Sequence, residues 1–108
     1  MAPRGYADVV PYDTPSSLAA LHGPTSGLVR VPPNIDTAPD PLYDLGNEVW
    51  LRMMYEAAIV AGFSHQQEEL LDRNTLIHLW PVLFLPERCR EAWEERFPEL
   101  PKSRSKRR

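Results

Sequence analysis

The sequence contains a single cysteine, Cys89, which excludes an internal disulfide framework. Low cysteine usage is typical of proteins kept in a reducing cytoplasm. No apolar run approaches the roughly 20 residues that a membrane-spanning helix needs. The N-terminal residues MAPRGYADVVPYD lack a hydrophobic signal core and include acids early, which argues against secretion. We therefore expect a cytoplasmic protein that makes no membrane contact.

Phosphate-binding and metal-binding patterns are also missing. The five glycines are scattered and form neither GxGxxG nor a GKS loop. His22, His65 and His78 share no predicted helix face, and none stands at a zinc-ligand spacing from Cys89. Cys89 itself falls on a predicted helix face with two aromatic residues, where a small core residue is more common than a nucleophile. We expect no metal ion and no cofactor.

Carboxylates are plentiful, but their arrangement does not suit acid–base catalysis. Glu68 and Glu69 are neighbours, as are Glu94 and Glu95. Adjacent residues on a helix point about 100° apart and do not face each other. The sequence therefore predicts a protein that is not an enzyme and has no small-molecule substrate.

Proline is abundant, and most of the twelve prolines come before residue 42. This distribution predicts four segments: a flexible N-terminus over 1–15, an extended arm over 16–41, a helical domain over 42–101 and a disordered basic tail over 102–108. The expected fold is mainly α, a small bundle of three to four short helices. The proline-rich arm is expected to contain at most one short strand.

The arm (residues 16–41) carries one helix signal and one strand signal. Ser16 and Ser17 precede a short apolar run that should end at Gly23, which predicts a short helix with a hydroxyl N-cap. Leu28 to Val31 is the best strand candidate, and Pro32 ends it. No second strand is evident, so we expect an edge strand that is offered to another chain.

The helical domain begins with the longest amphipathic pattern. From Leu42 or Asp44 to Ala61 the apolar residues recur every three or four positions, and Gly62 is placed to end the helix. Trp50 and Met54 widen its apolar stripe beyond what a narrow core contact needs. One side of this helix is therefore expected to present a broad apolar surface that can bind another protein.

Further helices follow at Ser64, where Gln67 completes a capping box, and at Asp72 or Asn74. Pro81 ends the second of these. A last helix runs from Pro86 to Pro98, with an inner face of residues spaced by four: Cys89, Trp93 and Phe97. We assign these three residues to the core.

Charge is distributed unevenly along the chain. Residues 1–101 hold all 15 acids and seven bases, a balance of −8, whereas residues 102–108 hold five bases and no acid. An acidic body favours a partner with a basic surface. The basic tail could bind nucleic-acid phosphates without sequence preference, although no predicted helix carries the basic face that reads a DNA groove.

The chain has more large apolar side chains than a small core can bury, because a domain of about 60 residues buries only roughly 60% of the surface that its unfolded chain exposes. Exposed aromatic residues and methionine are enriched at interfaces. We expect two partner-binding surfaces, one pairing a strand and one filling apolar pockets. The residues assigned to the first are Leu28, Val29 and Val31, and those assigned to the second are Trp50, Met54 and Trp80.

Four segments together resemble a known class of proteins: SLAALHGPTSGLVRVP (17–32), VWLRMMYE (49–56), LIHLWPVLFLP (76–86) and AWEERFP (92–98). They are similar to small actinobacterial antitoxins encoded beside AbiEii-type nucleotidyltransferase toxins, of the mycobacterial Men type. The resemblance implies a protein that binds and neutralises such a toxin, which transfers nucleotides onto tRNA acceptor ends. The alternative is a small nucleic-acid-associated regulator anchored by the basic tail.

Overall fold

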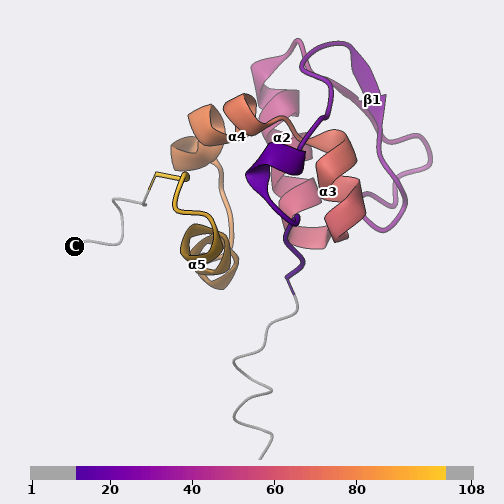
Figure 1. The fold of residues 1–108 in the computed structure, drawn as a ribbon. Coiled ribbons are helices and arrows are strands. Elements are labelled where there is room, and N and C mark those ends of the chain that lie inside the picture. The colour runs from indigo at the N-terminus through magenta and orange to yellow at the C-terminus, as the bar shows by residue number, and fades with distance from the viewer. Residues whose placement is uncertain (1–11, 102–108) are drawn as a thin grey trace, which may run out of the picture.

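A computed structural model describes residues 12–101 and shows a mainly α-helical fold with a small sheet (Figure 1). The elements in chain order are η1 (Leu18–Ala20), β1 (Leu28–Arg30), β2 (Leu42–Asp44), α2 (Glu48–Ala61), α3 (Ser64–Leu70), α4 (Arg73–Leu79), η2 (Trp80–Val82) and α5 (Glu87–Arg96). The predicted mainly α class is confirmed. The predicted basic tail over 102–108, and residues 1–11 of the predicted flexible N-terminus, lie outside the described residues.

The strand predicted to lack a partner has one in this chain. β1 pairs with β2 in an antiparallel sheet, with Leu28 opposite Asp44 and Arg30 opposite Leu42. The expectation that this strand has no partner in the chain is therefore wrong, and so is the helix start at residue 42 or 44, because β2 occupies residues 42–44. The arm over 16–41 itself contains one strand, β1, as predicted. The helix begins later because the Asn47 side chain accepts hydrogen bonds from the first backbone N–H groups of α2.

The arm does not wrap over a separate helical core but forms part of that core. Leu18, Leu21, Val31 and Ile35 are buried in the same hydrophobic cluster as the helices. Pro15, which was assigned to the flexible N-terminus, is fully buried as well. Burial of these side chains removes apolar surface from water, so the arm contributes to the stability of the whole fold.

Hydrogen bonds attach the arm to α3. The backbone N–H of His22 donates to the Glu68 carbonyl at 2.9 Å, and that of Gly23 donates to the Leu71 carbonyl at 2.7 Å. The N–H and Oγ of Ser16 both donate to the Glu68 carboxylate at 2.9 Å, and these bonds lower the pKa of Glu68. The two segments are therefore held backbone to backbone.

Replacement of Gly23 by alanine is expected to reduce the free energy of unfolding by about 1–3 kcal/mol, the usual range for overpacking. A Cβ atom at Gly23 would lie 2.3 Å from the Leu70 carbonyl carbon, and this backbone atom cannot move without displacing α3. Urea denaturation followed by circular dichroism measures the change. Gly46→Ala is the control, because its closest neighbour is a side-chain oxygen at 3.2 Å. Equal stabilities for the two variants would contradict the close approach.

Of the two caps predicted for the shorter helices, the one for α4 is observed, whereas the Ser64 and Gln67 box predicted for α3 is wrong, because α3 is preceded by Phe63 as its N-cap. The Phe63 N–H donates to Gln66 Oε1 at 2.9 Å, so Gln66 and not Gln67 makes the capping contact. Asp72 caps α4 by accepting from the Thr75 N–H at 3.0 Å. Of the two residues predicted as possible caps of α4, Asp72 is the one observed.

Gln67 is buried, and its side-chain amide binds backbone carbonyl groups instead of capping α3. Its Nε2 lies 3.0–3.4 Å from four backbone carbonyl oxygens, those of Asp13, Ala58, Ile59 and Gly62. Three of these carbonyls belong to the C-terminal end of α2 and the residue after it, where helices leave carbonyl groups short of intrahelical donors, although the Ala58 carbonyl also accepts from the Gly62 N–H. One amide therefore joins the N-terminal segment, α2 and α3.

Aromatic residues form the core between η2 and α5, and the predicted burial of Cys89, Trp93 and Phe97 is confirmed. The Trp93 ring stacks on Trp80 at a centroid distance of 5.9 Å and meets Phe97 edge-on at 5.6 Å. Trp80 Nε1 donates to the buried Glu94 carboxylate at 2.9 Å. The core beneath α5 is therefore both stacked and hydrogen-bonded.

Candidate functional site

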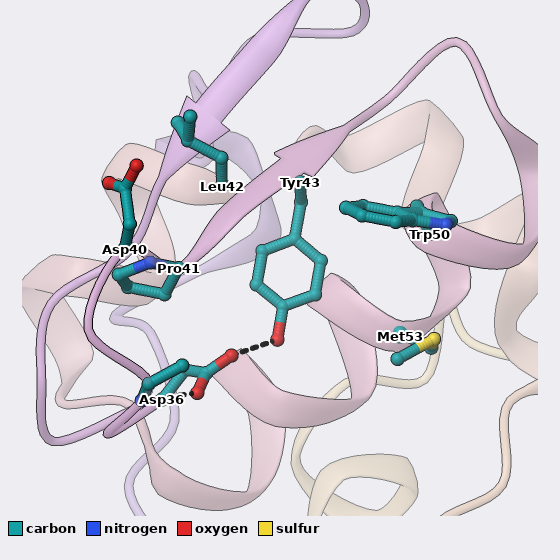
Figure 2. Close-up of a pocket in the computed structure, with 8 residues that line it drawn as sticks. Asp36, Asp40, Pro41, Leu42, Tyr43, Trp50 and Met53 are labelled. Carbon is teal, nitrogen blue, oxygen red and sulfur yellow. Dashed lines mark hydrogen bonds between the residues drawn. The ribbon is translucent and has the colours of Figure 1, made fainter.

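A pocket of about 210 Å³ opens between the β1–β2 connection and the first turns of α2 (Figure 2). We call it the Tyr43 pocket. Tyr43 lies at its centre, with Asp36 at the hydroxyl end of the ring and Trp50 beside it. The residues that line it are Asp36, Ala38, Asp40, Pro41, Leu42, Tyr43, Trp50 and Met53.

The register of the sheet and the cap of α2 place these residues. β2 presents Tyr43 toward α2, and the helix that starts after Asn47 carries Trp50 in its first turn. The two rings meet edge to face, with centroids 6.1 Å apart and planes at 73°, a preferred geometry for aromatic pairs. Asp36 is held from the other side, because the Tyr43 hydroxyl donates to its Oδ2 at 2.6 Å.

Hydrogen bonding keeps the Asp36 carboxylate ionised. The bond from the Tyr43 hydroxyl, with a second from the Ala38 N–H to Oδ1 at 2.9 Å, lowers the pKa of Asp36. Burial and the adjacent carboxylate raise the pKa of Tyr43 to about 12, so its hydroxyl remains a donor. A second carboxylate, Asp40, pairs with Arg30 at 3.1 Å. The pocket thus has an acidic side that persists at neutral pH.

The other side of the pocket is apolar and accessible. Trp50 and Met53, which line this side, are 45% and 49% exposed, and Val49, which lies outside the pocket on the same helix, is 52% exposed. Val49 lies four positions before Met53 and Trp50 lies three positions before it, so both are neighbours of Met53 on the helix surface. We call the side of α2 that carries these three residues the α2 face. Phe84, the most exposed large apolar residue described, is anchored to the same helix by its N–H, which donates to the Glu56 carboxylate at 2.7 Å. Apolar surface of this kind is typical of interaction sites.

Three of the six residues predicted to bind a partner are not accessible. Met54 and Trp80 are fully buried and Val31 nearly so, and all three belong to the core cluster. A side chain that fills the core of its own chain cannot reach a pocket on another protein, so these assignments are wrong. Trp80 is also engaged, through its hydrogen bond to Glu94.

The remaining three predicted residues occupy the surface or its margin. Trp50 is on the α2 face, Leu28 is 69% exposed on β1, and Val29 is half-buried against the core. The β1 strand lies at the end of the molecule opposite α5 (Figure 1). The structure therefore brings Trp50 into the Tyr43 pocket and leaves Leu28 on a separate strand.

One edge of β1 is open. Val31 N–H donates to Pro41 and Leu45 N–H donates to Gly27, so the hydrogen-bonded positions of β1 are 27, 29 and 31. In an antiparallel pair the alternate residues direct their backbone groups the other way. The register therefore directs the N–H groups of Leu28 and Arg30 away from β2. The edge can thus accept a strand even though β2 covers the other side.

Sequence patterns did not reveal Asp36 and Tyr43 as site residues. Asp36 stands in the predicted extended arm, and Tyr43 stands where a helix was expected to start. The one sequence signal for this site was the position of Tyr43, which follows a proline-rich stretch and directly precedes the predicted amphipathic helix. This signal does not show that the Tyr43 hydroxyl contacts Asp36. The two residues are brought together only by the folded path of the connection between β1 and β2.

Other candidate chemistry is not supported by the geometry. Burial raises the pKa of Cys89 to about 12, so its thiol is neutral at physiological pH. Among residues 12–101 no three His, Cys, Asp or Glu side chains are grouped as a metal ion would need. In the same part of the chain no helix is long and apolar enough to cross a membrane.

Stability is expected to fall between pH 10 and pH 12 because of Tyr55. Burial raises the pKa of this tyrosine to about 12, whereas an unfolded tyrosine ionises near pH 10. Above pH 10 the unfolded state loses the proton first, so Tyr55 alone lowers the free energy of unfolding by up to about 1.4 kcal/mol per pH unit. Urea denaturation at pH 8 to 12 measures the slope. Tyr55→Phe should make the slope shallower without abolishing it, because Tyr43, whose pKa is also raised to about 12, contributes in the same direction. An unchanged slope would contradict the assignment.

The chain was compared with protein-family models, with curated proteins and with solved structures. No match was found in any of the three comparisons.

Proposed function

We propose that this protein is an antitoxin that binds and neutralises a cognate nucleotidyltransferase toxin by direct protein–protein contact. The observation that carries the proposal is the exposed α2 face beside the acidic Tyr43 pocket. Solvent-accessible tryptophan and methionine are residue types enriched at protein–protein interfaces, and the carboxylates beside them offer charge complementarity to a basic partner. The resemblance to Men-type antitoxins supplies the class of partner.

Charge supports the same partner class. Residues 12–101 contain fourteen acids and six arginines, a net charge of −8. A toxin that acts on tRNA must present a basic surface to the phosphate backbone. Opposite charges increase the rate of association and disfavour incorrect partners. An acidic antitoxin could thus compete with tRNA for the same face of the toxin.

The deciding experiment is co-expression with the neighbouring nucleotidyltransferase gene. We expect growth to be restored and the two proteins to co-purify as a stable complex. Persistent toxicity in cells that contain abundant antitoxin, with no complex recovered, would refute the proposal. The accumulated level of the protein must be measured in the same cells, so that poor expression is not mistaken for lack of neutralisation.

The competing proposal, a nucleic-acid-associated regulator, rests on the five bases in residues 102–108. It requires DNA or RNA binding that weakens steeply with salt and disappears when these residues are removed. Within residues 12–101 the longest helix, α2, has two glutamates and one arginine, which does not suit a phosphate backbone. Equal binding with and without the tail would exclude this alternative.

A further inference from the structure

We propose that the Tyr43 pocket is a receptor for one arginine side chain of the partner protein. This inference rests on the proposed function for the identity of the partner, and it adds the chemistry by which the partner is recognised. Three features of the pocket lead to it: a carboxylate with unused acceptor capacity, an accessible apolar wall and a volume suited to a single side chain.

The carboxylate is Asp36. An ionised carboxylate offers about four lone-pair sites, two on each oxygen. The structure uses one site on each: Ala38 N–H donates to Oδ1 and the Tyr43 hydroxyl donates to Oδ2. These bonds hold the group in place, and as far as residues 12–101 are concerned both oxygens retain a free acceptor site. A guanidinium group binds such a carboxylate through two parallel N–H donors.

The neighbouring carboxylate is already satisfied by an arginine of this chain. Arg30 lies 3.1 Å from Asp40, and both side chains are more than half exposed. Asp40 thus has a cationic partner at the margin of the pocket, whereas Asp36 forms no ion pair within residues 12–101. The internal pair also shows that an arginine fits beside this loop.

The apolar wall consists of Trp50 and Met53, each about half exposed. Arginine has a stem of three methylene groups that packs along apolar surface while the charged end reaches a polar partner. A tryptophan ring also attracts a guanidinium through its π-system. Trp50 and Asp36 line the same pocket from opposite sides of Tyr43 (Figure 2), so one side chain can use both.

Size and charge favour this occupant over others. A volume of about 210 Å³ lies below the roughly 300–1,000 Å³ of typical small-molecule sites but far above the space of a single water. A second copy of this acidic chain would bring like charge to the pocket. Arginine is preferred over lysine because an ammonium group is more strongly hydrated and cannot form the two parallel bonds.

The first test uses the full chain and small probes. Isotope-labelled protein is titrated with Nα-acetyl-arginine amide while the indole N–H of Trp50 is followed by NMR. The control probe is Nα-acetyl-citrulline amide, which has nearly the same shape without the charge. We expect saturable shifts at Trp50 with the arginine probe and roughly tenfold weaker binding of the citrulline probe, since charged pairs form the stronger hydrogen bonds. Equal affinities, or no saturable shift, would overturn the inference.

Variants then locate the binding. Trp50→Ala and Asp36→Asn should each weaken binding of the arginine probe by roughly tenfold, whereas Phe63→Ala, also at a half-exposed aromatic residue, should leave it unchanged. Circular dichroism shows whether each variant is folded. In the complex with the toxin, unchanged affinity of a folded Trp50→Ala variant would refute the pocket and leave the proposed function standing. Failure of the wild type to form any complex would refute the function, while the probe titration still decides whether the pocket takes arginine.

Discussion

Replacement of Trp93 by alanine is expected to lower the free energy of unfolding by about 3–5 kcal/mol, which is the range found when large aromatic residues are removed from cores. Trp93 has no solvent exposure and packs between Trp80 and Phe97. Alanine would leave a cavity that neighbouring rings cannot close. Urea denaturation monitored at 222 nm by circular dichroism measures the loss. A change below 1 kcal/mol would mean that α5 is not packed as described.

Phenylalanine variants separate packing from hydrogen bonding in this core. Trp93 Nε1 is buried and has no hydrogen-bond partner among the described residues, so Trp93→Phe sacrifices no hydrogen bond. Trp80→Phe removes the donor to the Glu94 carboxylate and leaves a buried acceptor with one partner fewer. We expect Trp80→Phe to be more destabilising by about 1–3 kcal/mol, the cost of a buried polar group that loses its partner. The reverse order would contradict the buried hydrogen bond.

Replacement of Gln67 by leucine should lower the free energy of unfolding by about 2–4 kcal/mol, because each buried group left without a partner costs about 1–3 kcal/mol. The amide has two N–H hydrogens to share among four carbonyls, at the C-terminal end of α2 and at Asp13. Leucine fills a similar volume and supplies neither hydrogen. Thermal and urea denaturation both measure the effect.

A further variant with a control tests whether the Gln67 side chain acts as a hydrogen-bond donor to these carbonyls. Gln67→Glu presents a carboxylate to the carbonyl oxygens at neutral pH and should be at least as destabilising as leucine. Protonation converts that carboxylate to a group with one O–H donor, so acidification should restore part of the stability relative to the wild type. Gln66→Leu is the control, because Gln66 caps α3 at the surface. If Gln66→Leu were the more damaging variant, the role assigned to Gln67 would be incorrect.

The features predicted correctly from sequence depend on neighbours along the chain. The spacing of Cys89, Trp93 and Phe97 specifies one helix face without reference to any other element. The Asp72 cap involves residues three apart, and Gly62 follows the last residue of α2. Gly62 has an extended backbone, and it is required because a Cβ there would lie 2.5 Å from the Ala58 carbonyl oxygen.

The features that were missed depend on contacts between distant segments. β2 contains three residues and pairs with β1 across the connection formed by residues 31–41. No local pattern marks so short a strand. The same limitation affected the α2 surface: sequence showed that Met53 and Met54 both belong to a wide stripe, and only the packed fold places Met54 in the core and Met53 in solvent.

The attachment of the arm to α3 has a consequence for protein synthesis. Ser16 precedes Glu68, its hydrogen-bond partner, by 52 residues. At about 5–20 residues per second, a ribosome needs roughly 3–10 s to add α3 after the arm has been made. During that interval α3 does not yet exist, so Leu18 and Leu21 cannot enter the core that buries them in the finished protein. A product that terminates before α3 would keep these residues exposed for as long as it survives, so the cell could distinguish incomplete chains from finished ones by the arm alone.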